Sequence, residues 1–146
     1  MLASVRRAAL PLAKSLRANS EILSSLKAKR ILVGLITGKG QRSTQLTLRN
    51  YGLEDFFDVV KTVASSGPVK DRKIEEVIEE FSLDRKEILY VGDAPSDVTA
   101  CRDCDIKIAA AAWTPTANAA ELKQVRPDFL FSSVSAFFDF LRNQLA

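Results

Sequence analysis

Hydrophobic residues along this chain follow two alternating patterns. The segment 31–36 is a short, nearly continuous apolar run, typical of a strand that is covered on both faces. The segment 71–81 instead carries apolar residues at i, i+3, i+4 and i+7, the spacing that places them on one face of a helix. Taken along the whole chain, the two patterns predict strands at 31–36, 58–64, 87–91, 106–113 and 128–131, and helices at 21–29, 41–51, 71–81, 116–124 and 134–145. A further helix follows the loop 92–97 and ends at about 104.

Alternation of strands with helices favours parallel strand pairing, because a parallel connection needs a crossover that a helix usually supplies. We therefore expect an α/β fold: a Rossmann-like parallel sheet with helices on both faces, in three α/β/α layers. Ligands of such sheets bind beyond the carboxyl ends of the strands. Two loops of unusual composition follow predicted strands at that edge, TGKG at 37–40 and GDAPSD at 92–97.

Composition agrees with a globular domain and excludes several functions. The chain has 146 residues, 47% hydrophobic and 27% charged, and it contains no histidine. Ser-His-Asp catalysis and histidine-ligated metal sites are thereby excluded. The apolar runs are far shorter than the ~20 residues of a membrane helix, and basic residues are not interleaved with aromatic ones. We expect neither membrane nor nucleic-acid binding.

Positive charge is concentrated near the N-terminus. Residues 1–20 hold four basic residues and no acidic residue, so we interpret them as a basic arm that precedes a core domain at 21–146. The arm is either an organellar transit peptide or an amphipathic surface helix interrupted near Pro11. The expected location is the cytoplasm, in keeping with two cysteines, or the mitochondrion if the arm is a transit peptide.

Two carboxylates mark the loop 92–97. Asp93 comes at the carboxyl end of a predicted strand, and Asp97 follows in the first turn of the next helix. Two hard oxygen donors at this spacing suit Mg²⁺, which binds one or two carboxylates together with water and phosphate. The alternative is helix capping, because aspartate at a helix start is common and stabilising.

The loop 37–40 has the composition of an anion site. Thr37 supplies a hydroxyl, and Gly38, Lys39 and Gly40 supply amides and a positive charge between a strand and a helix. The alternative is a strand-to-helix turn that needs flexible glycines. A Walker loop does not fit the spacing, and no acidic residue follows the next strand to bind a ribose, so dinucleotide binding is disfavoured.

Two lysines lie at the same predicted edge of the sheet. Lys70 precedes the amphipathic helix, and Lys73 lies one turn further along. A lysine here neutralises a phosphate or pairs with Asp93, or else it is a solvated surface residue.

These pieces together resemble the haloacid dehalogenase-like (HAD) hydrolases, in particular their phosphoglycolate phosphatase-like branch. The matching segments are ILVGLITGK at 31–39, YGLEDFFDVV at 51–60 and EILYVGDAPSD at 87–97, within a resemblance that covers about 21–146. The resemblance implies that Thr37 and Gly38 bind phosphate, that Lys70 stands near the third-motif lysine, with Lys73 as the alternative, and that Asp93 and Asp97 hold Mg²⁺. It further implies hydrolysis of a small phosphorylated metabolite.

The chain departs from this family in its first motif. The family carries Asp-x-Asp-x-Thr after a central first strand, and its first aspartate is the phosphorylated nucleophile. The Asp-x-Asp in this chain, Asp103-Cys104-Asp105, follows a helix and points away from the site. The family's lysine usually lies about two residues before Lys70, at Pro68, and its cap domain is absent. The chain is therefore a fragment, a misassigned gene product or a remodelled relative.

The missing motif leads to two expectations. The chain is expected to be an inactive phosphatase-type hydrolase or, alternatively, a non-catalytic module that binds an anion or a partner. Without a first strand in the basic arm, the strands at 31–36 and 87–91 would lack their shared neighbour, and we expect a homodimer.

The two cysteines form a Cys-x-x-Cys at Cys101 and Cys104. The motif closes a predicted helix, whereas reactive pairs open one, and histidine is absent. We expect both thiols to pack in the core.

Overall fold

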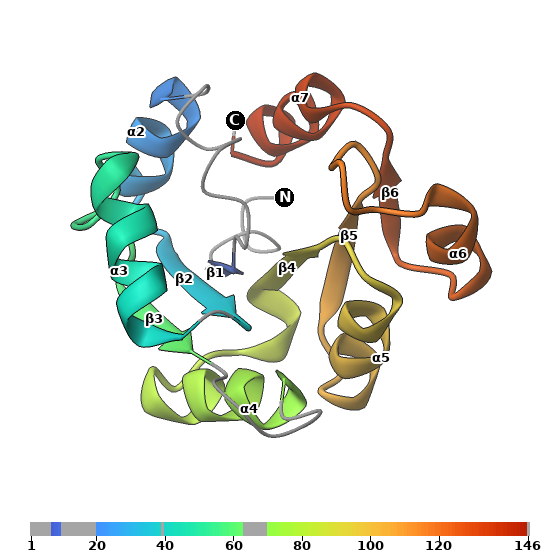
Figure 1. The fold of residues 1–146 in the computed structure, drawn as a ribbon, viewed down its shortest axis with the longest axis horizontal. Helices are drawn as coiled ribbons and strands as arrows, with labels where there is room; N and C mark the ends of the chain where they lie inside the picture. Colours follow the sequence, from blue (N-terminus) through green and yellow to red (C-terminus); the bar gives the residue numbers. More distant parts are fainter. Residues whose placement is uncertain (1–6, 10–19, 39, 63–69, 146) are drawn as a thin grey trace.

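The structure, a computed structural model, describes residues 7–9, 20–38, 40–62 and 70–145 of the chain. Strands and helices alternate along these residues (Figure 1). The strands are β1 (Arg7–Ala9), β2 (Leu32–Thr37), β3 (Val59–Thr62), β4 (Ile88–Gly92), β5 (Lys107–Ala111) and β6 (Phe129–Phe131). The helices are α2 (Ser20–Ala28), α3 (Gln41–Asn50), α4 (Lys70–Glu80), α5 (Pro95–Asp103), α6 (Ala119–Gln124) and α7 (Val134–Leu145).

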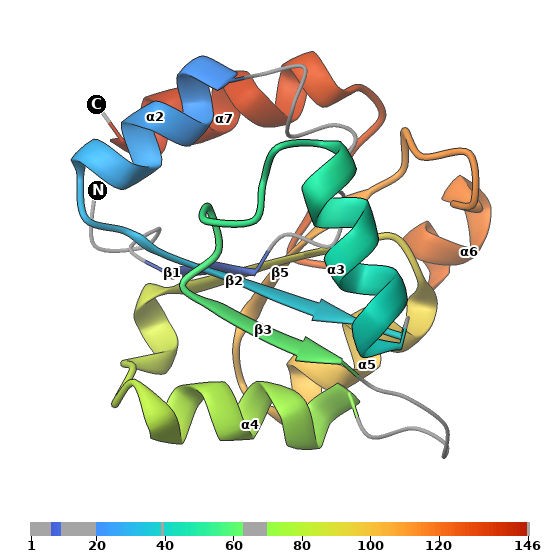
Figure 2. The same ribbon diagram turned by 60° about the vertical axis from the view of Figure 1, so that its left-hand side comes forward.

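The six strands form one parallel sheet in the order β3-β2-β1-β4-β5-β6. Helices α2 and α7 lie on one side of this sheet and α4 on the other (Figure 2). Buried residues of α2, α3 and α7 form one apolar cluster with the sheet, and those of α4, α5 and α6 form a second. The expected α/β fold with three layers is confirmed.

The expectation that the basic arm contains no strand is wrong. Strand β1 lies within it and occupies the centre of the sheet, with Ala8 opposite Val33 on β2 and opposite Leu89 on β4. Parallel pairing uses backbone N–H and C=O groups, so three residues without an apolar run can still fill a central position. The other interpretations of the arm, a transit peptide or a surface helix, concern residues outside the described part of the chain.

The paired β1 also removes the reason given for self-association. Strands β2 and β4 both bond to β1 and therefore have no open edge at the centre of the sheet. A homodimer stays a prediction without that support.

Most element boundaries lie within two residues of the prediction, and the largest difference falls after β5. The strand ends at Ala111 and α6 begins at Ala119, so residues 112–118 form a loop where we expected a strand end and a helix start. Pro115 cannot donate to a ladder, and Asn118 caps α6 by accepting a hydrogen bond from the Glu121 amide at 3.2 Å. This loop lies at the same edge of the sheet as the loop after β4.

None of the helices among the described residues is long and apolar enough to cross a membrane.

Candidate functional site

The predicted site residues gather at the carboxyl edge of the sheet. Thr37 ends β2, Asp93 follows β4, and Lys70 begins α4. Strand β1 separates β2 from β4, so the carboxyl ends of those two strands are about 10 Å apart, two strand spacings.

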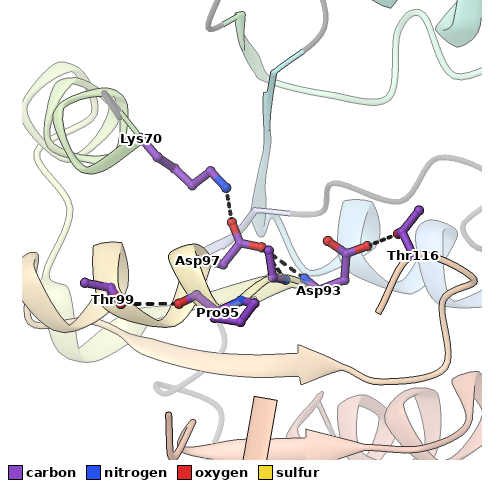
Figure 3. A network of polar contacts seen from close by, with 7 residues as sticks. Lys70, Asp93, Pro95, Asp97, Thr99 and Thr116 are labelled. Atoms are coloured by element: carbon purple, nitrogen blue, oxygen red, sulfur yellow. Dashed lines mark hydrogen bonds and ion pairs between the residues drawn. The ribbon is translucent and has the colours of Figure 1, made fainter. Parts of the chain in front are cut away.

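Asp97 is buried and fully engaged. Its side chain is 5% exposed, and its Oδ2 atom accepts hydrogen bonds from the Asp93 and Ala94 amides, both at 3.0 Å. Its Oδ1 atom contacts the Lys70 ammonium (Figure 3). Ala94 is the N-cap of α5, so the bond from its amide to the third helical residue is the capping arrangement weighed in the sequence analysis.

Gly92 lets Asp97 approach the chain this closely. A Cβ atom built on Gly92 would lie 2.5 Å from Asp97 Oδ2, a separation that atoms do not tolerate. A glycine directly before Asp93 is therefore required by the packing of the loop.

Asp93 is held by hydroxyl groups instead. Its Oδ2 atom accepts from Thr114 Oγ1 at 3.0 Å and from Thr116 Oγ1 at 2.8 Å, both from the loop after β5. Within the described part of the chain, no hydrogen bond or ion pair engages the other oxygen, Oδ1. One oxygen of Asp93 is thus available to a ligand.

Of the two candidate lysines, Lys70 reaches the site. It pairs with Asp97, whereas Asp93 was the partner considered among the alternatives in the sequence analysis. Lys73 pairs with Glu76 on its own helix at 3.1 Å. Lys70 is therefore the lysine at the loop 92–97, and Lys73 lies along α4 with its partner Glu76.

The loop 37–40 is only partly described. Thr37 ends β2 partly buried, Gly38 is exposed, and Gly40 is the N-cap of α3 without a side-chain hydrogen bond. Lys39 lies outside the described residues. The predicted phosphate-binding roles of Thr37, Gly38 and Lys70 stay predictions.

The groups beneath the loop 92–97 stay uncharged at neutral pH. Burial, and next the charge of Asp97, raise the pKa of the Tyr90 hydroxyl and of the Cys101 thiol above their ordinary values. Burial and the charge of Glu75 raise the pKa of Cys104 to about 12. Both cysteines are buried in the core, as expected, and serve packing.

The residues at this edge fit Mg²⁺ through a single carboxylate. No group of three or more acidic or cysteine side chains that could hold a metal ion occurs among the described residues. Both oxygens of Asp97 already have protein partners, whereas Asp93 Oδ1 is an open hard donor of the kind that Mg²⁺ uses together with water and phosphate oxygens. The Mg²⁺-binding roles predicted for Asp93 and Asp97 stay predictions; Asp93 Oδ1 is the open donor of the pair, and the Asp93 amide donates to Asp97 Oδ2.

Sequence reasoning missed Thr114 and Thr116. Both lie after β5, at the edge where ligands of parallel sheets bind. Two hydroxyls on either side of a proline at that position were the available signal, and the predicted helix start at 116 obscured it.

The segment after β1 lacks the carboxylate that the resemblance requires. The residues that follow, LPLAKSLRANS at 10–20, contain no aspartate or glutamate. The central strand is therefore present, and residues 10–20 after it offer no carboxylate.

Comparison with known proteins agrees with this arrangement. The family model described as haloacid dehalogenase-like hydrolase matches residues 6–111, which include β1 and the loop 92–97. The pyrophosphatase PpaX of Bacillus cereus (strain B4264) is 30% identical over 125 residues, 84% of this chain and 57% of that protein. Its namesake from Bacillus thuringiensis (strain Al Hakam) is 29% identical over 117 residues, 79% and 54% of the two chains. This chain thus spans little more than half the length of these curated relatives.

Two solved structures share the fold. A hydrolase of the haloacid dehalogenase-like family from Streptococcus pneumoniae superposes with a TM-score of 0.72 at 20% identity, over 84% of this chain and 57% of its own. A predicted phosphoglycolate phosphatase from Haemophilus somnus 129PT gives 0.70 at 22%, over 84% and 55%. With the family match covering more than half of the sequence, the chain belongs to the haloacid dehalogenase-like hydrolases.

Proposed function

We propose that this chain binds the phosphate group of a small phosphorylated molecule together with Mg²⁺, and that it does not hydrolyse the phosphate. The observation that carries the proposal is the difference between two neighbouring strand ends. Asp93 after β4 has one carboxylate oxygen open, whereas residues 10–20 after β1 hold no acidic side chain.

Binding would use the residues that meet at the carboxyl edge of the sheet. Asp93 lies beside the Lys70–Asp97 pair, and its open oxygen Oδ1 would bind the cation. When bound, Mg²⁺ supplies charge neutralisation to a phosphate. Thr37 and the amides around Gly38 would donate hydrogen bonds to phosphate oxygens from the β2 side.

Hydrolysis by covalent catalysis needs a nucleophile that this edge does not supply. The relatives are named pyrophosphatases and phosphatases, and the resemblance assigns their chemistry to an aspartate after the first strand. Without a carboxylate in residues 10–20, no acyl phosphate forms there.

The test combines a binding assay with a turnover assay on the whole chain. Calorimetric titration with inorganic phosphate in the presence of Mg²⁺ should show saturable binding that Asp93→Asn weakens by about tenfold or more. Incubation with pyrophosphate or p-nitrophenyl phosphate should release no phosphate above background. A Mg²⁺-dependent rate that Asp93→Asn abolishes would contradict the absence of turnover, and a failure to bind phosphate would contradict the binding role.

A further inference from the structure

The loop after β5 is tied to the carboxylate after β4. Thr114 and Thr116 both donate to Asp93 Oδ2, at 3.0 and 2.8 Å, and their own hydroxyl oxygens lie 3.5 Å apart. Figure 3 shows Thr116 approaching Asp93 from the side opposite to Lys70 and Asp97. Two donors on one oxygen fix the rotation of the carboxylate, because turning it breaks both bonds at once.

The two hydroxyls hold Asp93 without neutralising it. Asp97 pairs with a lysine and caps a helix, so its charge is compensated within the protein. Hydroxyl groups are neutral donors, so the two threonines bring no positive charge to Asp93. The arrangement orients a charged carboxylate and leaves its Oδ1 atom open, which a lysine in the same place would not do.

The same loop also packs against the core, at the residue next to Thr114. Trp113, directly before Thr114, stacks on Phe137 of α7 with ring centroids 5.5 Å apart and an interplanar angle of 24°. Thr114 is itself buried, at 8% exposure. Asp93 is thereby connected to α7 through Thr114 and the neighbouring Trp113.

We propose that Thr114 and Thr116 are positioning residues, which orient Asp93 and couple the loop 112–118 to the occupancy of the site. The coupling to a ligand rests on the proposed function, because it takes phosphate and Mg²⁺ to bind beside Asp93. The orientation of Asp93 by the loop does not depend on a ligand and has its own test.

The ligand-free test uses Trp113, the one tryptophan of the chain. Acrylamide quenching of its fluorescence is measured for the wild type, the double variant Thr114→Val/Thr116→Val, Asp93→Ala, and the triple variant. Valine keeps the shape of threonine and removes the hydroxyl. We expect the double variant and Asp93→Ala each to raise the quenching constant about twofold, and the triple variant to add nothing further.

Two controls separate positioning from a loss of folding. Thr99→Val removes a hydroxyl that donates to the Pro95 carbonyl at 3.3 Å on the exposed side of α5, without touching Asp93, and it should leave the quenching unchanged. Thr114→Ser/Thr116→Ser keeps both hydroxyls and should restore the behaviour of the wild type. Quenching that is unchanged in the valine variant, or additive in the triple variant, would overturn the positioning role.

The ligand test titrates the same proteins with MgCl₂ and inorganic phosphate. We expect the affinity to fall about tenfold in the valine variant and to recover in the serine variant. Equal affinity of the valine variant and the wild type would overturn the coupling while leaving the proposed function intact. Absence of binding in the wild type would overturn the proposed function and the coupling, while non-additive quenching would still support the orientation of Asp93.

Discussion

Strands β1 and β4 lie side by side at the centre of the sheet, but the residues that follow their carboxyl ends differ in acidic side chains. All five residues of β4 are buried, and it leads into a loop in which Gly92, Asp93 and Asp97 form a dense set of contacts. Strand β1 has three residues, and residues 10–20, which follow it, include no acidic residue. A strand can therefore hold a central position through its backbone alone while contributing no carboxylate to the site. Strand pairing at this edge of the sheet therefore does not require the strand to supply a side chain to the site.

The largest effect should come from removing β1. Deletion of residues 1–20 takes away a strand that pairs on both sides, leaving backbone groups of β2 and β4 unpaired at about 1–3 kcal/mol each. We expect the truncated chain to lose cooperative unfolding in urea, followed by circular dichroism. A truncated chain with an unchanged transition would show that β1 is dispensable.

The difference between the two strands also explains what the sequence could predict. The strand β4 and the loop after it were recognisable because an apolar run precedes a glycine and two aspartates. Strand β1 was missed because its pairing uses main-chain atoms that every residue carries, and Arg-Ala-Ala shows no apolar run. The contacts of Thr114 and Thr116 with Asp93 were missed because they join segments 21 and 23 residues apart, and no local pattern reports such a distance.

The free energy of unfolding should depend strongly on Asp97, which holds the loop after β4 together. Replacing it with alanine leaves the Asp93 and Ala94 amides without an acceptor and Lys70 without its partner, which should lower the free energy of unfolding by about 3 kcal/mol. Asp103→Ala, at the exposed end of the same helix, is the matched control and should change it by less than about 0.5 kcal/mol. Equal effects of the two substitutions in urea denaturation would remove Asp97 from the structure of this loop.

Alkaline pH should weaken the packing below the same loop. The folded protein raises the pKa of Cys104 to about 12 and that of Cys101 as well, whereas unfolded thiols ionise near their ordinary values. Above about pH 9 the unfolded chain therefore binds fewer protons, and stability falls as pH rises, by about 1.4 kcal/mol per thiol and pH unit. Urea denaturation of Cys104→Ala at pH 8 and pH 10 should show a smaller loss than that of the wild type; an identical loss would contradict the assignment.

Replacing Gly92 with alanine should lower the stability of the folded protein, and replacing Gly38 should not. In Gly92→Ala the new Cβ atom forces Asp97 away from the amides it accepts from, at a cost of about 2 kcal/mol. A Cβ atom at Gly38 meets nothing within 4 Å, so Gly38→Ala should be neutral to within about 0.5 kcal/mol. Thermal unfolding of the two variants distinguishes a loop that is packed from one that is open, and a neutral Gly92→Ala would show that Asp97 has room to move.

The smallest effect on stability should come from Asp93, although it is the residue on which the proposed ligand binding depends. Asp93 is partly exposed, and in Asp93→Asn an amide oxygen can still accept from the hydroxyls of Thr114 and Thr116. We therefore expect the free energy of unfolding to change by less than about 0.5 kcal/mol. Phosphate binding in the presence of Mg²⁺ should nevertheless weaken, because the negative charge that attracts the cation is gone. Calorimetry tests the expected loss of phosphate binding, and urea denaturation of the same preparation tests the expected stability. A large loss of stability would make Asp93 a structural residue like Asp97, and the contrast between the two carboxylates of this loop would disappear.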